Sequence, residues 1–150
     1  MQIRRFNVSD AFEVSSLIRR SIIYRDNRNY SLNNIYSIAN HYCVENICAK
    51  LEDKIIYVAI EDEKIIGTAT LNKDEIMAVF IDPQSQGKGL GKKFMELLEK
   101  DAMNKGLSKV WLVAGLSAVS FYEKIGYKFV SDKFHPEWGR AKYMEKVFLT

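Results

Sequence analysis

Two periods of hydrophobic residues run through the chain, and each predicts one kind of element. Short apolar stretches bounded by polar residues, glycine or proline indicate strands, which we expect at residues 2–6, 55–60, 64–71, 75–81, 109–114, 127–133 and 141–149. Apolar residues three and four positions apart indicate helices, which we expect after Ser9, after Ser31, after the glycines that precede Leu90, and after Ser117. The serines suit helix starts because a side-chain hydroxyl accepts a hydrogen bond from the first turn.

The same pattern predicts buried side chains and the fold class. The helix after Ser9 should bury Phe12, Leu17 and Ile18. The next helical region, with an interruption, carries the apolar residues Leu32, Ile35, Ile38, Ile47 and Leu51. We expect Gly106 to end the helix that follows the glycines. The order is one strand, two helical regions, three strands, a helix, a strand, a helix and two strands. Antiparallel hairpins with a single strand–helix–strand crossover predict the α+β class.

The segment "IDPQSQGKGLGKKFMELLEK" joins a predicted strand to a predicted helix through Gly87, Gly89 and Gly91. Glycine lets a ligand approach the backbone without meeting a Cβ atom, and a helix N-terminus offers unpaired N–H groups to an anion. Residues 76–150 carry 12 basic and 8 acidic side chains, against 10 and 11 in residues 1–75. This mild excess of positive charge favours an anionic cofactor over a nucleic acid, which would call for a denser basic patch.

Comparison with known phosphate-binding motifs distinguishes between the possible interpretations of this loop. A P-loop needs a serine or threonine after its lysine, and "GKGLGKKF" has none. A dinucleotide fingerprint needs a third glycine where this chain has Lys92, and it belongs to an early βαβ unit, whereas this loop lies past the middle of the chain. A glycine-rich turn without a ligand stays open on composition alone. The pattern Q-x-x-G-x-G is met by Gln86, Gly89 and Gly91.

At these residues the sequence resembles the GNAT N-acetyltransferases, which use acetyl-CoA. "VFIDPQSQGKGLGKKFMELLEK" is similar to the CoA-binding segment of that family, and "SFYEKIGYKF" is similar to its C-terminal motif, a helix with a tyrosine followed by a strand. The resemblance covers essentially the whole chain in element order. It implies the GNAT acyl-CoA N-acyltransferase fold, with a mixed, mostly antiparallel sheet of about seven strands flanked by about four helices in a single domain.

The resemblance further implies acetyl-CoA as cosubstrate and no metal. Loop N–H groups would hold the pyrophosphate. The extended pantetheine arm would pair with the preceding strand, which a bulge would splay from the strand at 109–114. The cofactor-binding residues so implied are Val79, Phe80, Ile81, Gln86, Gly87, Lys88, Gly89, Leu90, Gly91 and Lys92. Many members carry an asparagine after the strand that matches 109–114. This chain has "GLSAVS" there, so Ser117 and Ser120 are the candidate contacts.

Acetyl transfer to an amine requires a base, a donor to the developing oxyanion and an acid for the leaving thiolate. An amine with a pKa near 10.4 is almost fully protonated at pH 7, so a base contributes about 10²–10⁴-fold. Glu75 matches a position where some family members carry a glutamate base, and alternation places it on one face with Met77 and Val79. The Val79 N–H matches the oxyanion donor, and Tyr122 matches the general acid. From the residues alone, Glu75 is equally consistent with a loop acid, Tyr122 with a core aromatic and Val79 with a plain core strand.

The acceptor is the least determined part of the expectation. By resemblance, the first two helices and the last hairpin form the acceptor cleft, whose candidate lining residues are Tyr24, Arg25, Arg28, Tyr30, His135, Trp138 and Arg140. Small amines, amino acids, aminoglycosides and protein N-termini all remain open. We expect a small-molecule or peptide amine acceptor, no nucleic-acid or membrane partner, and a monomer or homodimer. The alternative function is a catalytically silent module that senses acyl-CoA.

Length and composition narrow the classes of protein and the cellular locations that we expect. The 150 residues fit one domain, and no apolar stretch approaches the roughly 20 residues that a membrane span needs. Residues 1–14 contain no continuous apolar core of a secretory signal, which makes a cytoplasmic location the expectation. Cys43 and Cys48 lie in a helical pattern and do not share a helix face with His41. They predict buried thiols rather than a metal site or a disulfide framework.

Overall fold

The structure, a computed structural model, describes residues 1–26, 31–135 and 139–148. Within them, seven strands form one sheet in the order β1-β2-β3-β4-β5-β7-β6. The strands are β1 Gln2–Arg5, β2 Lys54–Glu61, β3 Lys64–Asn72, β4 Glu75–Ile81, β5 Lys109–Gly115, β6 Lys128–His135 and β7 Gly139–Val147. All neighbouring strands pair antiparallel except β4 and β5, which are parallel. The predicted strands and the α+β class are confirmed.

The described residues contain five α-helices, one more than the resemblance implied. They are α1 Ala11–Asp26, α2 Leu32–His41, α3 Val44–Ile47, α4 Leu90–Asn104 and α5 Val119–Lys124. Short 3₁₀ turns lie at η1 Val8–Asp10, η2 Leu51–Asp53, η3 Pro83–Ser85 and η4 Leu116–Ala118. The predicted interruption in the second helical region produces the extra helix, because α2 ends at His41 and α3 starts three residues later. Gly106, with φ +85°, follows the end of α4 as predicted.

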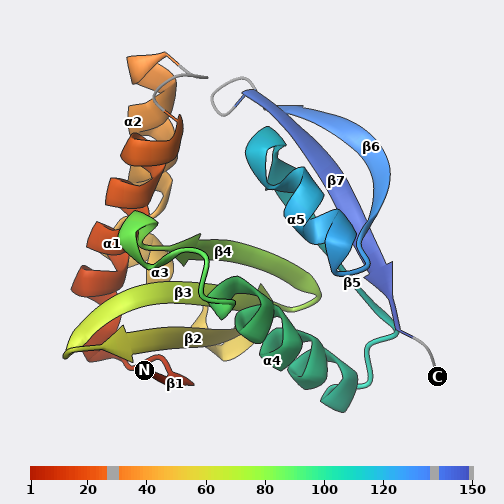
Figure 1. Cartoon of the computed structure of the whole chain (residues 1–150), viewed down its shortest axis with the longest axis horizontal. Helices are drawn as coiled ribbons and strands as arrows, with labels where there is room; N and C mark the ends of the chain where they lie inside the picture. The colour runs from red at the N-terminus through yellow and green to blue at the C-terminus, as the bar shows by residue number, and fades with distance from the viewer. Residues whose placement is uncertain (27–30, 136–138, 149–150) are drawn as a thin grey trace.

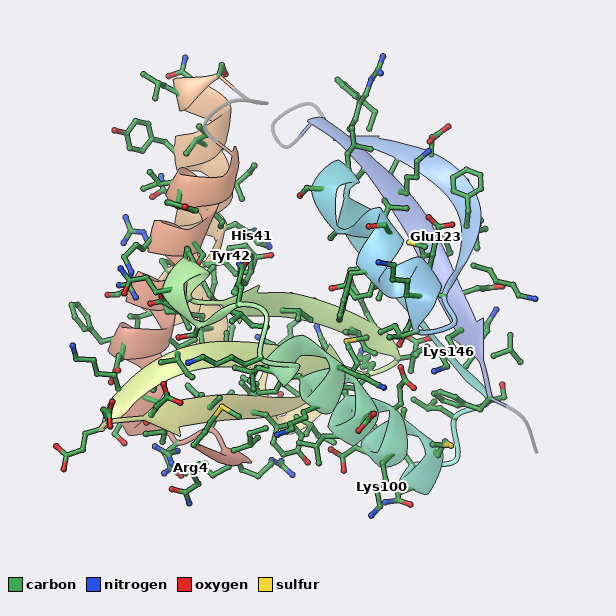
Figure 2. The ribbon with its side chains drawn as sticks, in the orientation of Figure 1. Arg4, His41, Tyr42, Lys100, Glu123 and Lys146 are labelled. Atoms are coloured by element: carbon green, nitrogen blue, oxygen red, sulfur yellow. The ribbon has the colours of Figure 1, made fainter. Side chains whose placement is uncertain are left out.

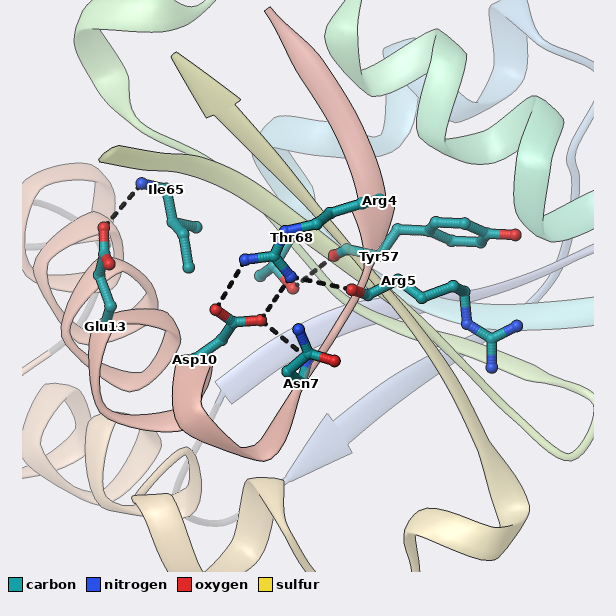
Figure 3. A network of polar contacts seen from close by, with 8 residues as sticks. All are labelled: Arg4, Arg5, Asn7, Asp10, Glu13, Tyr57, Ile65 and Thr68. Atoms are coloured by element: carbon teal, nitrogen blue, oxygen red, sulfur yellow. Dashed lines mark hydrogen bonds and ion pairs between the residues drawn. The ribbon is translucent and has the colours of Figure 1, made fainter. Parts of the chain in front are cut away.

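The predicted start of α1 is wrong. Asn7 rather than Ser9 caps the turn that leads into α1, and the Asn7 N–H donates to the Asp10 carboxylate over 2.8 Å. Both terminal guanidinium nitrogens of Arg4 also contact Asp10, at 2.8 and 2.9 Å (Figure 3). Hydrogen bonding to Arg4 therefore lowers the pKa of Asp10. The buried face of α1 runs through Val14 and Ile18, so Phe12 falls outside it and is 77% exposed, contrary to prediction.

The start of α5 also differs from the prediction. Ser117 lies inside the 3₁₀ turn η4, and the helix begins at Val119 without a side-chain cap. The chain already turns helically through η4, so no separate serine cap is needed at this end of β5.

Two layers of helices cover the two faces of the sheet. On one face α4 packs Phe94 and Leu98 against Leu71 of β3 and Ile76 of β4. On the other face α1 contributes Ile18 to a second core, which also contains Val58 of β2 and Phe80 of β4. Glu13 ties α1 to β3, because its carboxylate accepts the Ile65 N–H over 2.7 Å (Figure 3). None of the described helices combines the length and apolar character needed to cross a membrane.

The sheet opens between β4 and β5. Their one registered pair is Glu75 with Trp111, where the Trp111 backbone N–H and indole N–H donate to Asp74 over 3.2 and 3.0 Å. Beyond that end the strands diverge, and Figure 1 shows β5, β7 and α5 leaning away from β4. The predicted bulge is confirmed at Ala78, which has φ +54°. Strands β4 and β5 therefore form the two arms of a V, which meet at Glu75.

Candidate active site

A hollow of about 470 Å³ occupies the opening between β4 and β5. The two strands form its walls, and residues from α2, α5 and the β6–β7 hairpin complete it. Among its lining residues are Glu75, Val79, Tyr122 and Arg140, which the sequence had nominated for separate roles. We call this hollow the cleft.

The bulge changes which side chains of β4 share a face. Met77 pairs with Thr70 and Phe80 pairs with Thr68, so Ala78 and Val79 together occupy the place of one residue. Simple alternation therefore fails beyond Met77. The prediction that Glu75 and Val79 share a face is wrong, because Val79 packs with the core under α4 while Phe80 packs with the core under α1. Both Glu75 and Val79 still line the cleft, since the strands diverge there.

The edge of β4 toward β5 has no registered strand partner after Glu75, among the pairings of the described residues. A strand edge without a partner presents backbone N–H and C=O groups that an extended chain can pair with. Val79 and Phe80 line the cleft along this part of β4, whereas the Ile81 carbonyl accepts a hydrogen bond from the Gln86 side chain. Their side chains are engaged in packing, so the groups that face the cleft along this edge are mainly those of the backbone.

Glu75 stands at the closed end of the cleft, half-buried between the two strands. Burial raises the pKa of its carboxyl group, the charge of Asp74 raises it further, and Lys133 opposes the shift. A carboxylate with a raised pKa holds a proton more tightly than an ordinary glutamate does, which suits a group that accepts protons.

Tyr122 reaches the cleft from α5 and is only 8% exposed. Its ring makes edge contacts with Phe121 and Tyr127, with centroids 5.1 and 5.7 Å apart. Tyr127 is itself fixed, because its hydroxyl donates to Glu99 over 2.8 Å, and Lys146 contacts the other oxygen of Glu99 at 2.8 Å. Burial raises the pKa of Tyr127, so this phenol remains a neutral donor. A rigid polar cluster thus stands behind the Tyr122 ring.

The glycine loop leads into α4 with its backbone exposed. Gly87 and Gly89 have φ values of +83° and +77°, and a Cβ atom built on either would meet nothing within 4 Å. The first bond of the helix runs from the Lys93 N–H to the Gly89 carbonyl over 3.1 Å. The N–H groups of Leu90, Gly91 and Lys92 therefore have no partner in the helix. Open space and unpaired N–H groups coincide, which is the arrangement that binds anions.

The other loop residues have mainly structural contacts. A Cβ atom on Gly91 would lie 3.2 Å from Phe121, so this glycine permits α4 to approach α5. The Gln86 side chain donates to the Ile81 carbonyl over 3.4 Å and holds the loop against β4. Lys88 forms an exposed ion pair with Glu61 at 3.4 Å. These residues position the loop and leave its N–H groups as the candidate anion-binding groups.

Ser117 and Ser120 are exposed and lie outside the residues that line the cleft, whereas the neighbouring Ala118 lines it. Tyr24 is 70% exposed and borders a different groove, alongside Arg20 and Asp82. Arg28, Tyr30 and Trp138 lie outside the described residues, as do the side chains of Arg25 and His135.

Sequence reasoning missed two residues that line the cleft, His41 and Tyr42. They follow each other where α2 ends, with their ring centroids 5.2 Å apart (Figure 2). Tyr42 packs edge-on against Phe80, with the centroids 5.4 Å apart. From the sequence alone, His41 is considered only as a metal ligand, and that role is rejected. Residues 1–26, 31–135 and 139–148 hold no group of three His, Cys, Asp or Glu placed to bind a metal. Cys43 and Cys48 are free thiols, only partly buried rather than fully so.

The family model of the acetyltransferase (GNAT) domain matches residues 26–148. The chain therefore belongs to the GNAT acetyltransferases. A curated relative, GCN5-related N-acetyltransferase 2, chloroplastic, from Arabidopsis thaliana, is 32% identical over 73 residues, which are 45% of this chain and 28% of that protein. The chain spans 28 to 32% of the length of the first curated relatives it matches.

Two solved structures share the fold. PaiA N-acetyltransferase from Thermoplasma acidophilum, in complex with coenzyme A, has a TM-score of 0.85 at 23% identity, covering 98% of both chains. A GCN5-related N-acetyltransferase from Rhodopseudomonas palustris has a TM-score of 0.87 at 23% identity, covering 98% of this chain and 95% of that one. The family and the fold implied by the sequence resemblance are confirmed.

Proposed function

We propose that the chain is an acetyl-CoA-dependent N-acetyltransferase that moves an acetyl group to a primary amine by direct attack. The observation that carries the proposal is a single cleft bordered by an unpaired strand edge, a half-buried carboxylate and a buried tyrosine. Family membership supports the reaction class, and the coenzyme A complex of the T. acidophilum relative supports the cosubstrate.

The residues present fit coenzyme A at two places. The loop around Gly87 and Gly89 has open space, and the N–H groups at the start of α4 have no partner in the helix, so both suit the pyrophosphate. The edge of β4 toward β5, which has no registered strand partner after Glu75 among the described pairings, suits the amides of the pantetheine arm. Acetyl-CoA supplies an activated acetyl thioester, and the chain supplies the groups around it.

Each catalytic group has a place in the cleft. Glu75 accepts the proton of the attacking amine, directly or through water, and its raised pKa suits that task. The Val79 N–H donates to the carbonyl oxygen as negative charge develops on it. Tyr122 donates its phenolic proton to the departing sulfur and regains one from solvent. These three roles together need no covalent bond to the protein.

The experiment is a panel of primary amines incubated with acetyl-CoA, with free thiol release and the acetylated amine both measured, and CoA binding followed by calorimetry. We expect micromolar to millimolar saturation by acetyl-CoA and a matched amount of acetylated amine. CoA binding without turnover of any amine would instead support the silent sensor module, which no feature of the described residues favours. Absence of CoA binding would reject both functions.

A further inference from the structure

A second hollow, of about 250 Å³, opens beside the cleft on the face of the sheet that carries α1. Four residues line both hollows: His41, Tyr42, Met77 and Ala78. The second hollow therefore begins where the bulge of β4 meets the turn after α2. We call it the side hollow.

Strand register places the side hollow next to the candidate base. Glu75 pairs with Asn72, and Asn72 pairs with Lys54. Directly paired residues share a face of the sheet, and neighbouring strands lie about 4.8 Å apart. Asn72 and Lys54 both line the side hollow. A ligand whose amine lies at Glu75 of β4 can thus extend across Asn72 of β3 to Lys54 of β2.

The side hollow has an apolar wall and a cationic end. Val14, Ile18, Ile47 and Ile56 come from three elements and form the apolar wall, while Thr68, Thr70 and Asn72 line the hollow from β3. Lys54 lies at the far end, where its ammonium group donates to the main-chain carbonyls of Asn46 and Ile47 over 3.1 and 3.4 Å.

Lys54 keeps donor capacity for a ligand. An ammonium group has three N–H donors, and the two carbonyls use two of them. Burial lowers the pKa of Lys54, while Cys48 and Glu52 act in the opposite direction more weakly. A partly desolvated ammonium group gains more from an anionic partner than an exposed one does.

We infer that the side hollow binds the non-reacting arm of the amine acceptor, and that the preferred acceptor is a primary amine with a compact apolar arm ending in a carboxylate or carbonyl. The inference rests on the proposed function and names the substrate class of the same site. Size supports it, because an apolar cavity of about 150 Å³ already holds a benzene ring. Burying such a ring favours binding by about 10- to 100-fold.

The test compares kcat/KM for three amines: ethylamine, phenethylamine and phenethylamine with a para-carboxylate. The native chain should prefer phenethylamine over ethylamine by at least about tenfold, and the carboxylate should add to this preference. Thr70→Phe fills the side hollow from β3 and should reduce the preference for phenethylamine to less than about twofold. Thr70→Val keeps the size of the side chain and is the matched control, which should retain the preference.

A second pair of variants tests the cationic end. Lys54→Met removes the charge at similar size and should abolish the added preference for the carboxylate while the preference for the phenyl ring persists. Lys100→Met, on the exposed face of α4, is its control (Figure 2). Thermal melting and acetyl-CoA affinity establish that each variant is folded. Equal kcat/KM for ethylamine and phenethylamine in the native chain would overturn the inference.

A binding measurement separates this inference from the proposed function. Phenylpropionate carries the ring and an anion but no amine, so its binding requires no turnover. In methyl NMR of the native chain it should shift the signals of Ile47 and Ile56, and Thr70→Phe should remove these shifts. If no amine is acetylated but the shifts occur, the proposed function fails and the side hollow stands as a binding site. If amines are acetylated and the shifts are absent, the inference fails alone.

Discussion

The two sides of the cleft are built from different parts of the polypeptide. The side proposed to bind the cofactor consists of main-chain groups: the N–H groups at the start of α4 and the edge of β4 toward β5. The side proposed to bind the acceptor consists of side chains from separate elements, among them Glu75, His41, Tyr42 and Arg140. Main-chain groups are the same for every residue except proline, so the cofactor side depends on the path of the backbone. The acceptor side depends on individual residues, and there one substitution changes the chemistry.

The largest effect should come from Glu75→Gln on the side-chain side of the cleft. The variant keeps the size of the side chain but cannot accept a proton, so kcat/KM at pH 7 should fall by about 10²–10⁴-fold. Acetyl-CoA affinity should remain, because the backbone provides that site. The loss should shrink as the pH rises toward 10, since more of the amine then arrives neutral.

The control for this variant is Glu123→Gln, which removes an exposed carboxylate of α5 that does not line the cleft. Its kcat/KM should stay close to that of the native chain. A loss in Glu75→Gln that is constant from pH 7 to pH 10, or no loss at all, would place the base elsewhere.

The next largest effect should come from Tyr122→Phe, which removes the hydroxyl and keeps the ring contacts with Phe121 and Tyr127. We expect kcat to fall by about 10–10³-fold with little change in acetyl-CoA affinity, because the proton donation matters only in the transition state. Steady-state kinetics with a known acceptor measure it. Tyr127→Phe also removes a phenol but from behind the cleft, and it should lower thermal stability rather than kcat. Full activity of Tyr122→Phe would assign that tyrosine to packing.

On the side of the cleft built from main-chain groups, an added side chain should weaken CoA binding by blocking access to the backbone. Gly89→Val adds a branched side chain where the structure has open space and φ +77°. The dissociation constant for CoA should rise at least about tenfold, or about 1.4 kcal/mol. Calorimetry measures it. Gly106→Val is the matched control, because Gly106 has φ +85° and similar open space but lies at the far end of α4. It should incur the same backbone strain without weakening CoA binding, so equal affinities in the two variants would refute the loop assignment.

The same contrast explains what the sequence could predict. The glycine loop and the strand before it form a local motif, so spacing along the chain was enough to find them. The strands were predictable for a similar reason, because period and turn residues are local signals. The bulge at Ala78 was expected from the resemblance, but its effect on Val79 was not, since an added residue inverts the alternation beyond it. His41 and Tyr42 reach the cleft only through the packing of α2 over the sheet, and no spacing in the sequence records that contact.

The smallest effect concerns stability, and it distinguishes the two sides once more. Burial raises the pKa of Glu75 above the ordinary value of 4.5. Between pH 4.5 and that raised pKa, the folded chain binds more protons at Glu75 than the unfolded chain does. The free energy of unfolding therefore falls as the pH rises through this window.

A glutamine at position 75 stays neutral at every pH in this window. Glu75→Gln should therefore gain thermal stability relative to the native chain between pH 4 and pH 8, by a few degrees or less. Glu123→Gln, which removes an exposed carboxylate from α5, should show no such gain. If the stability of Glu75→Gln relative to the native chain is the same at pH 4 and pH 8, the native fold does not disfavour the charged form of Glu75. The stability of the fold would then be as insensitive to this side chain of the cleft as we expect it to be to Glu123.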